Sequence, residues 1–364
     1  MKKDDSKIFR VLTIDGGGVR GLYTAALLDD LTRHYAEKKQ TGALDLGKGF
    51  NLIAGTSTGG ILACALASGV PLDEIMDLYI SEGQKIFPSP IPDKKPGLAL
   101  WAARHSCKSS ADSQVFQNKL VEVFGEKTLE NVYLERGIAL CIPSVYASSM
   151  GSKVFKTPHL PSLTIDKKRL LADVCMATSA APIVFPISEQ VDPGNSARKE
   201  HFVDGGLWAN NPVLVGMLEA LAIVQENQEY DEIHVFSIGT CAPSNGNVVS
   251  TLDKGLLSWK FGIEPLNHSL EAQADGTGHI ARLLAEHLKV KTKVIRLPSD
   301  PPSNQESKAL GLDNATQKAV QILLQRSQQD SQLILSRIRS RDESLMLLED
   351  VFQDMPERGN NAGN

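Results

Sequence analysis

The chain has 364 residues, 42% of them hydrophobic, and 43 Asp and Glu residues outweigh 38 Lys and Arg residues to give a net charge of -5. This is the composition of a globular protein with a sizeable core, and its acidic balance argues against a DNA or RNA partner. No apolar run approaches the ~20 residues that span a bilayer, and no signal peptide follows the charged start, so we expect a cytoplasmic protein.

The five cysteines are odd in number, widely spaced and free of any C-x-x-C pair. This pattern indicates neither a disulfide framework nor a zinc site. We therefore expect the cysteines to be reduced core or surface thiols.

The first predicted strand, residues 8–14, ends at Asp15 and leads into a glycine turn, Gly16-Gly17-Gly18-Val19-Arg20-Gly21, before a helix over residues 22–35. The glycine spacing Gly16-x-Gly18-x-x-Gly21 matches the consensus of dinucleotide-binding sites. However, no clear strand ending in Asp or Glu follows about 20 residues later, as such sites require. A triphosphate-binding loop would need Gly-Lys-Ser/Thr at its end. Bunched glycine amides at a helix N-terminus also suit an oxyanion hole, and this interpretation fits best beside a serine nucleophile.

Such a serine is offered by the stretch Gly55-Thr56-Ser57-Thr58-Gly59-Gly60. An apolar strand precedes it and a helix of small apolar residues, 61–68, follows it. The spacing Gly-x-Ser-x-Gly between strand and helix is the nucleophile-elbow pattern, in which the serine hydroxyl is exposed at the carboxyl end of the sheet. We expect Ser57 to be the nucleophile if the chain also supplies a base.

Residues 87–110 break the pattern with several prolines followed by Leu98, Leu100 and Trp101. This segment is either a lid or membrane-facing loop over the active site, or a surface loop whose Trp101 packs into the core; we favour the second. Further elements are predicted as helices over 71–79, 115–124 and 170–178 and as strands over 138–145 and 153–156.

A second acidic residue, Asp204, stands at the tip of a predicted strand and is followed by Gly205-Gly206 and a helix over 213–224. Another strand is predicted over 232–238. The alternation of strands and helices indicates an α/β fold with a mostly parallel sheet. Because functional loops gather at the carboxyl ends of parallel strands, we expect Asp15, Ser57 and Asp204 to meet at one edge.

Beyond residue 250 the sequence predicts helices, including an amphipathic one over 313–338 capped by Asp313 or Asn314. We therefore expect a catalytic domain over residues 8–240, a helical C-terminal region over 241–356 that packs on it or extends it, and a disordered tail over 357–364.

The serine needs a base, and none of the eight histidines stands at a strand end. A carboxylate serves as base when a desolvated site raises its pKa toward neutral. Asp204 is therefore the better candidate.

Four blocks of the sequence resemble, in order, those of patatin-like phospholipases. They are the glycine turn from Asp15, the elbow around Ser57, Ala177-Thr-Ser-Ala-Ala-Pro182 with Phe185-Pro186, and Asp204-Gly-Gly-Leu-Trp-Ala-Asn-Asn-Pro212. The resemblance implies an α/β/α sandwich that hydrolyses lipid acyl esters through a Ser57–Asp204 dyad, without a metal and without a cofactor. It also implies an oxyanion hole of the Gly16, Gly17 and Gly18 amides, with Arg20 supporting the loop.

The implied substrate is a membrane phospholipid, which places the enzyme at the inner membrane surface. The layout is similar to that of bacterial members that act in anti-phage defence and that a cyclic di- or trinucleotide switches on. A constitutive lipid acyl hydrolase and a lipid-binding module without catalysis are the alternatives. The resemblance leaves open whether the chain forms a homo-oligomer.

Overall fold

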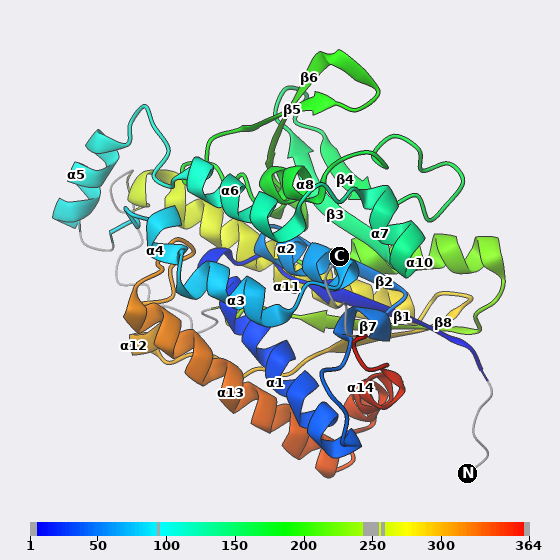
Figure 1. The fold of residues 1–364 in the computed structure, drawn as a ribbon. Helices are drawn as coiled ribbons and strands as arrows, with labels where there is room; N and C mark the ends of the chain where they lie inside the picture. Colours follow the sequence, from blue (N-terminus) through cyan, green and yellow to red (C-terminus); the bar gives the residue numbers. More distant parts are fainter. Residues whose placement is uncertain (1–5, 93–94, 243–254, 256–258, 360–364) are drawn as a thin grey trace.

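An eight-stranded sheet with helices on both faces forms the centre of the computed structural model, which describes residues 6–92, 95–242, 255 and 259–359 (Figure 1). The strands are β1 Ile8–Ile14, β2 Leu52–Gly55, β3 Ala139–Tyr146, β4 Ser152–Lys156, β5 Ser188–Asp192, β6 Asn195–Asp204, β7 Glu232–Ile238 and β8 Lys291–Arg296. They lie in the order β5-β6-β3-β2-β1-β7-β8, with β4 also paired to β3. Strands β3, β2, β1, β7 and β8 are parallel, whereas β4, β5 and β6 pair antiparallel. The prediction of a mostly parallel α/β/α sandwich is confirmed.

The two faces of the sheet follow from the alternation of side chains along each strand. Leu12 and Ile14 of β1 belong to a large core with α1, α2, α8 and α13, and Phe9 and Val11 belong to a second core with α10 and α11. The helices are α1 Gly21–Lys39, α2 Thr58–Ser68, α3 Leu72–Ile80, α4 Gly83–Ile86, α5 Lys95–Arg104, α6 Ser113–Phe124, α7 Leu129–Arg136, α8 Leu171–Thr178, α9 Gly206–Ala209, α10 Val213–Asn227, α11 Ile263–Ala285, α12 Asn304–Ser307, α13 Gln317–Arg339 and α14 Glu343–Asp354.

The C-terminal part of the chain is more than a set of helices. Strand β8, which the sequence analysis did not predict, extends the sheet beside β7. Helix α13 packs along α1, where the Tyr23 hydroxyl donates a 2.7 Å hydrogen bond to buried Asp330. The prediction of Asp313 or Asn314 as cap of this helix is wrong, because the Thr316 side chain accepts from the Ala319 amide and caps it.

The end of the described chain is tied to the fold. Glu357 forms a β-bridge with Leu44, and the Arg358 amide donates to the Ala43 carbonyl. The expectation of a tail without structure is therefore wrong for these two residues, and its last five residues, 360–364, lie outside the described part of the chain.

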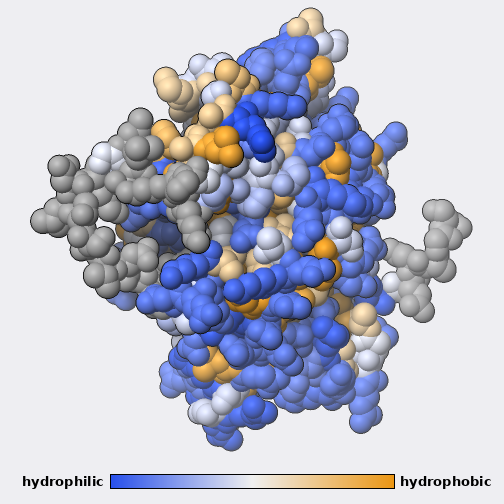
Figure 2. All heavy atoms as spheres, turned by 90° about the vertical axis from the view of Figure 1, so that its left-hand side faces the viewer, coloured by the Kyte–Doolittle hydropathy of each residue, from blue (hydrophilic) through white to orange (hydrophobic). Residues whose placement is uncertain are grey.

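Within the irregular segment 87–110, residues Lys95–Arg104 form helix α5. Trp101 of α5 is 8% exposed and packs with Leu98 and Ile263 in a small cluster apart from the two main cores. Trp101 is thus buried, as in the favoured prediction, although in a satellite cluster. Figure 2 shows the side of the molecule on which α5 lies in Figure 1. Hydrophobic residues, coloured orange, lie together in the upper part of this view. Among the described helices none is long and apolar enough to span a membrane.

Candidate active site

Ser57 lies in the sharp turn between β2 and α2. Its backbone has φ = 54° and ψ = -125°, a conformation that costs a non-glycine residue energy and that is concentrated at functional sites. Gly59 allows the close turn, because a Cβ there would lie 2.4 Å from the Ile14 carbonyl oxygen. The Thr178 hydroxyl accepts a 2.9 Å hydrogen bond from the Ser57 amide and so anchors the elbow to α8.

Asp204 reaches the same place from the opposite direction. Strand β4 occupies one edge of β3, where it pairs with both Cys141 and Ser144. Cys141 also pairs with β2 and Ser144 with β6, so β2 and β6 share the other edge of β3, one after the other. Because β2 runs parallel to β3 and β6 antiparallel, their carboxyl ends point at each other. The sequence predicted Asp204 at a strand tip but not that this strand is antiparallel.

The two side chains are in direct contact. The Ser57 hydroxyl donates a 2.7 Å hydrogen bond to Asp204 Oδ2, and the Gly206 amide donates a 2.6 Å bond to Asp204 Oδ1. Both residues are buried. Burial raises the pKa of Asp204 to about 6, against the opposing effect of the hydrogen bonds from Ser57 and Gly206. A carboxylate with this pKa is ionised at neutral pH and still basic enough to accept a proton.

The glycine turn lies against the elbow, since a Cβ on Gly16 would be 3.4 Å from Ser57 Cβ. The expectation that the Gly16 amide serves the oxyanion hole is wrong, because this amide donates a 2.9 Å hydrogen bond to the Asn210 carbonyl. Within the described chain the amides of Gly17 and Gly18 have no such partner. They are the two donors of this turn that remain available to an oxyanion.

Arg20 holds this turn from behind. Its Nε donates to the Gly17 carbonyl at 3.3 Å, and its Nη2 pairs with Glu271 Oε1 of α11 at 3.0 Å. The Arg20 side chain is 5% exposed. Arg20 therefore supports the glycine turn.

Asp15 does not join Ser57 and Asp204. Both of its carboxylate oxygens pair with Arg296 of β8, at 3.0 and 2.6 Å. Arg296 was not predicted as a site residue, because it belongs to β8, a strand that the sequence pattern does not predict.

Helix α11 supports the loop that follows Asp204. Gln273 accepts from the Asn210 amide and donates to the Trp208 carbonyl, both at 2.9 Å. Asn211 Nδ2 donates to the Ala274 carbonyl at 3.1 Å. A glutamine inside a predicted helix carries no local signal of such a role, so the sequence analysis missed Gln273 as well.

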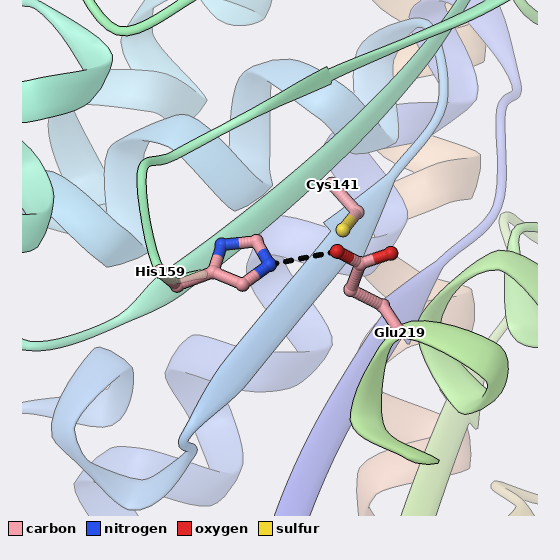
Figure 3. A group of neighbouring side chains, drawn as sticks. All are labelled: Cys141, His159 and Glu219. Atoms are coloured by element: carbon pink, nitrogen blue, oxygen red, sulfur yellow. Dashed lines mark hydrogen bonds and ion pairs between the residues drawn. The ribbon is translucent and has the colours of Figure 1, made fainter. Parts of the chain in front are cut away.

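A separate buried cluster brings together Cys141, His159 and Glu219, a set of side chains that can ligate zinc (Figure 3). The polar atoms of His159 and Glu219 already have partners. His159 Nε2 bonds to Glu219 Oε1 at 2.8 Å, and Lys156 pairs with Glu219 Oε2. His159 Nδ1 bonds to the Thr157 hydroxyl at 2.8 Å. We interpret the cluster as a structural network that joins β3, β4 and α10 on the face of the sheet opposite α2.

Ser57, Asp204 and the glycine turn have the geometry that an acyl-transfer site requires: a serine hydroxyl bonded to a carboxylate, beside amides that have no partner in the described chain. Comparison with known proteins agrees. The family model of patatin-like phospholipases matches residues 12–217.

Three bacterial relatives are each named cGAMP-activated phospholipase. The Escherichia coli (strain TW11681) protein is 32% identical over 256 residues, which cover 69% of this chain and 67% of the relative. The Pseudomonas aeruginosa (strain BWHPSA011 / Pa011) protein is 33% identical over 278 residues, which cover 75% of this chain and 74% of the relative. The Vibrio cholerae serotype O1 (strain ATCC 39315 / El Tor Inaba N16961) protein is 30% identical over 331 residues, which cover 88% of this chain and 89% of the relative. Because the family model spans more than half of the chain, this protein is a hydrolase that belongs to the patatin-like phospholipase family.

Proposed function

We propose that this protein hydrolyses acyl esters of membrane phospholipids through a Ser57–Asp204 dyad and that a cyclic dinucleotide activates it. The observation that carries the catalytic part is the 2.7 Å hydrogen bond between Ser57 Oγ and Asp204 Oδ2 at a strained elbow. The cyclic dinucleotide is proposed because the relatives covered over most of their length are named for activation by cGAMP.

The reaction begins when Asp204 takes the proton of the Ser57 hydroxyl as Ser57 Oγ attacks the ester carbonyl carbon. The amides of Gly17 and Gly18 stabilise the resulting oxyanion, each worth about 3 kcal/mol in comparable sites. Asp204 then gives its proton to the departing alcohol oxygen of the lysophospholipid, and an acyl-serine remains.

Water completes the cycle. Asp204 takes a proton from a water molecule whose oxygen attacks the acyl-serine carbonyl, and the second oxyanion occupies the same amides. Collapse of this intermediate breaks the ester bond to Ser57 Oγ, which recovers its proton from Asp204 as the fatty acid leaves.

The test is fatty-acid release from vesicles that contain a fluorogenic phospholipid, measured with and without cGAMP. We expect hydrolysis by the wild-type protein only with the nucleotide. Equal hydrolysis without it would show a constitutive lipid acyl hydrolase. No hydrolysis under either condition would contradict the catalytic proposal and favour a lipid-binding module.

We further propose that the side of the molecule around α5 contacts the membrane. Leu100 of α5 is 66% exposed, and Ile183 and Phe261 nearby are 42% and 37% exposed. Ile183 lies beside the segment that follows α5, because its carbonyl accepts a hydrogen bond from the Ser110 amide. Its backbone φ of 75° is strained for an isoleucine. Residues 98–111 include Arg104 and Lys108 but no Asp or Glu, in a chain of net charge -5. Exposed apolar side chains beside basic ones suit an anionic lipid surface.

Leu100→Asp is therefore expected to weaken binding to vesicles of phosphatidylcholine and phosphatidylglycerol about tenfold, because an inserted leucine contributes about 1.5 kcal/mol. Vesicle co-sedimentation measures this. Leu134→Asp is the matched control, since Leu134 is 75% exposed and belongs to α7, which lies on the opposite side of the molecule from α5 in Figure 1. Equal binding by both variants would place the membrane contact elsewhere.

A further inference from the structure

A second polar site lies behind the glycine turn. A cavity of about 610 Å³ opens between the carboxyl ends of β7 and β8 and helix α11. Asp15, Gly16 and Asn210 line its inner side, and Arg282 and Arg296 are the cations in its lining. Neither Ser57 nor Asp204 is among the described residues that line it. Gly16 and Asn210, which are joined by a backbone hydrogen bond, both line the cavity, and a Cβ on Gly16 would also lie 3.4 Å from Ser57 Cβ.

Two chains of contacts connect the cavity to the proposed oxyanion hole. In the first, Arg296 holds both carboxylate oxygens of Asp15, the residue that directly precedes the glycine turn. In the second, Glu271 pairs with Arg20, which donates to the Gly17 carbonyl. A ligand that draws on Arg296 or Glu271 would shift the turn that presents the Gly17 amide.

The cavity also contacts the loop of the base. Asn210 and Asn211 line it and belong to the segment that follows Asp204. Asn211 Nδ2 bonds to the Ala274 carbonyl of α11, in the same wall. One occupant of the cavity would therefore contact both the glycine turn and the loop that follows Asp204.

The lining has the mixed charge that a nucleotide needs. Arg282 is exposed and has no ion-pair partner in the described ranges, and the side chain of Arg296 is 37% exposed even while it pairs with Asp15. Guanidinium groups are well matched to phosphate oxygens. The same lining contains the carboxylates of Asp15, Glu271, Asp275 and Asp300. Asp15 and Glu271 pair with Arg296 and Arg20, and a carboxylate such as that of Asp275 or Asp300 is a suitable acceptor for the N–H groups of a purine base. A simple anion would be repelled by these carboxylates, whereas a cyclic purine dinucleotide uses both kinds of group.

We infer that this cavity is the binding site of the activating cyclic purine dinucleotide, with its phosphates on Arg282 and Arg296 and a base on Asp275 or Asp300. This inference rests on the proposed function. It adds the position of the site and a route to activation, in which the ligand repositions the glycine turn through Arg296 and Glu271.

Binding of cGAMP to the full chain, measured by isothermal titration calorimetry in a Ser57→Ala background, tests the site. Arg282→Glu is expected to weaken binding at least tenfold because it replaces a phosphate contact with a like charge. Gly278→Phe is expected to do the same by filling the cavity, since a Cβ at Gly278 points to within 3.9 Å of Arg282 Nη1 and meets no closer atom than Asn211 Nδ2 at 3.5 Å.

Each variant has a matched control. Arg339→Glu makes the same change at an exposed arginine at the far end of α13, and Gly276→Phe places the same ring on α11 in open space. Both controls should bind as the parent does, and thermal unfolding identifies any variant that has lost its fold. If all four variants bind cGAMP equally, the site is wrong while nucleotide activation stands. If the parent protein does not bind cGAMP at all, both the site and the proposed activation are wrong.

Discussion

Ser57→Ala is expected to lower the rate of phospholipid hydrolysis by at least about 10³-fold, which corresponds to about 4 kcal/mol in the activation free energy. The hydroxyl is the group that forms the acyl intermediate, and its loss leaves Asp204 able only to activate water. Fatty-acid release from fluorogenic vesicles in the presence of cGAMP measures the effect.

The matched control is Ser68→Ala at the other end of the same helix. Ser68 is also buried, but its hydroxyl bonds only to the carbonyls of Cys64 and Ala65 in its own helix. This variant should retain the wild-type rate per folded molecule. Equal activity of Ser57→Ala and the wild type would refute the proposed nucleophile.

The parts of this site that the sequence predicts are those with a local physical signature. An elbow needs small residues around its serine, because the chain turns so closely that a Cβ on Gly59 would meet the Ile14 carbonyl. The sequence also predicts the position of Asp204, because an acidic residue at the end of an apolar strand and before two glycines marks a turn. The strand ends therefore predicted that Ser57 and Asp204 lie together. The reason given, that both follow parallel strands, was wrong, because β6 is antiparallel. The third residue of the predicted group, Asp15, pairs with Arg296 instead.

The parts that the sequence did not predict depend on distant segments. Arg296 lies 281 positions from its partner Asp15, and nothing in its neighbourhood marks it as part of a site. The hydrogen bond from the Gly16 amide to the Asn210 carbonyl could not be predicted either, because every residue has a backbone carbonyl and the sequence does not mark this one. The alternating pattern of β8 is too short and too polar to stand out among the predicted helices.

Asp204→Asn is expected to reduce hydrolysis by about 10²- to 10⁴-fold, the usual range for loss of a general base. Asparagine is nearly the same size, its oxygen can still accept from the Gly206 amide, and its nitrogen can donate to Ser57 Oγ. The hydrogen bonds at the site are therefore replaced while the proton acceptor is lost. A variant with wild-type activity would show that another group deprotonates Ser57.

The pH dependence separates this catalytic role from a structural one. With the pKa of Asp204 raised by burial to about 6, wild-type hydrolysis should rise through pH 6, from roughly a tenth of its maximum at pH 5 to a plateau above pH 7. The same burial makes the ionised carboxylate costly to the fold. Below pH ~4 the group is protonated in both the folded and unfolded states and costs nothing, but as the pH rises past 6 the cost reaches about 3 kcal/mol. Urea denaturation should therefore show Asp204→Asn to be more stable than the wild type at pH 8, with the difference vanishing toward pH 4. An Asp204→Asn protein that is inactive and also less stable at pH 8 would instead mark Asp204 as a structural residue.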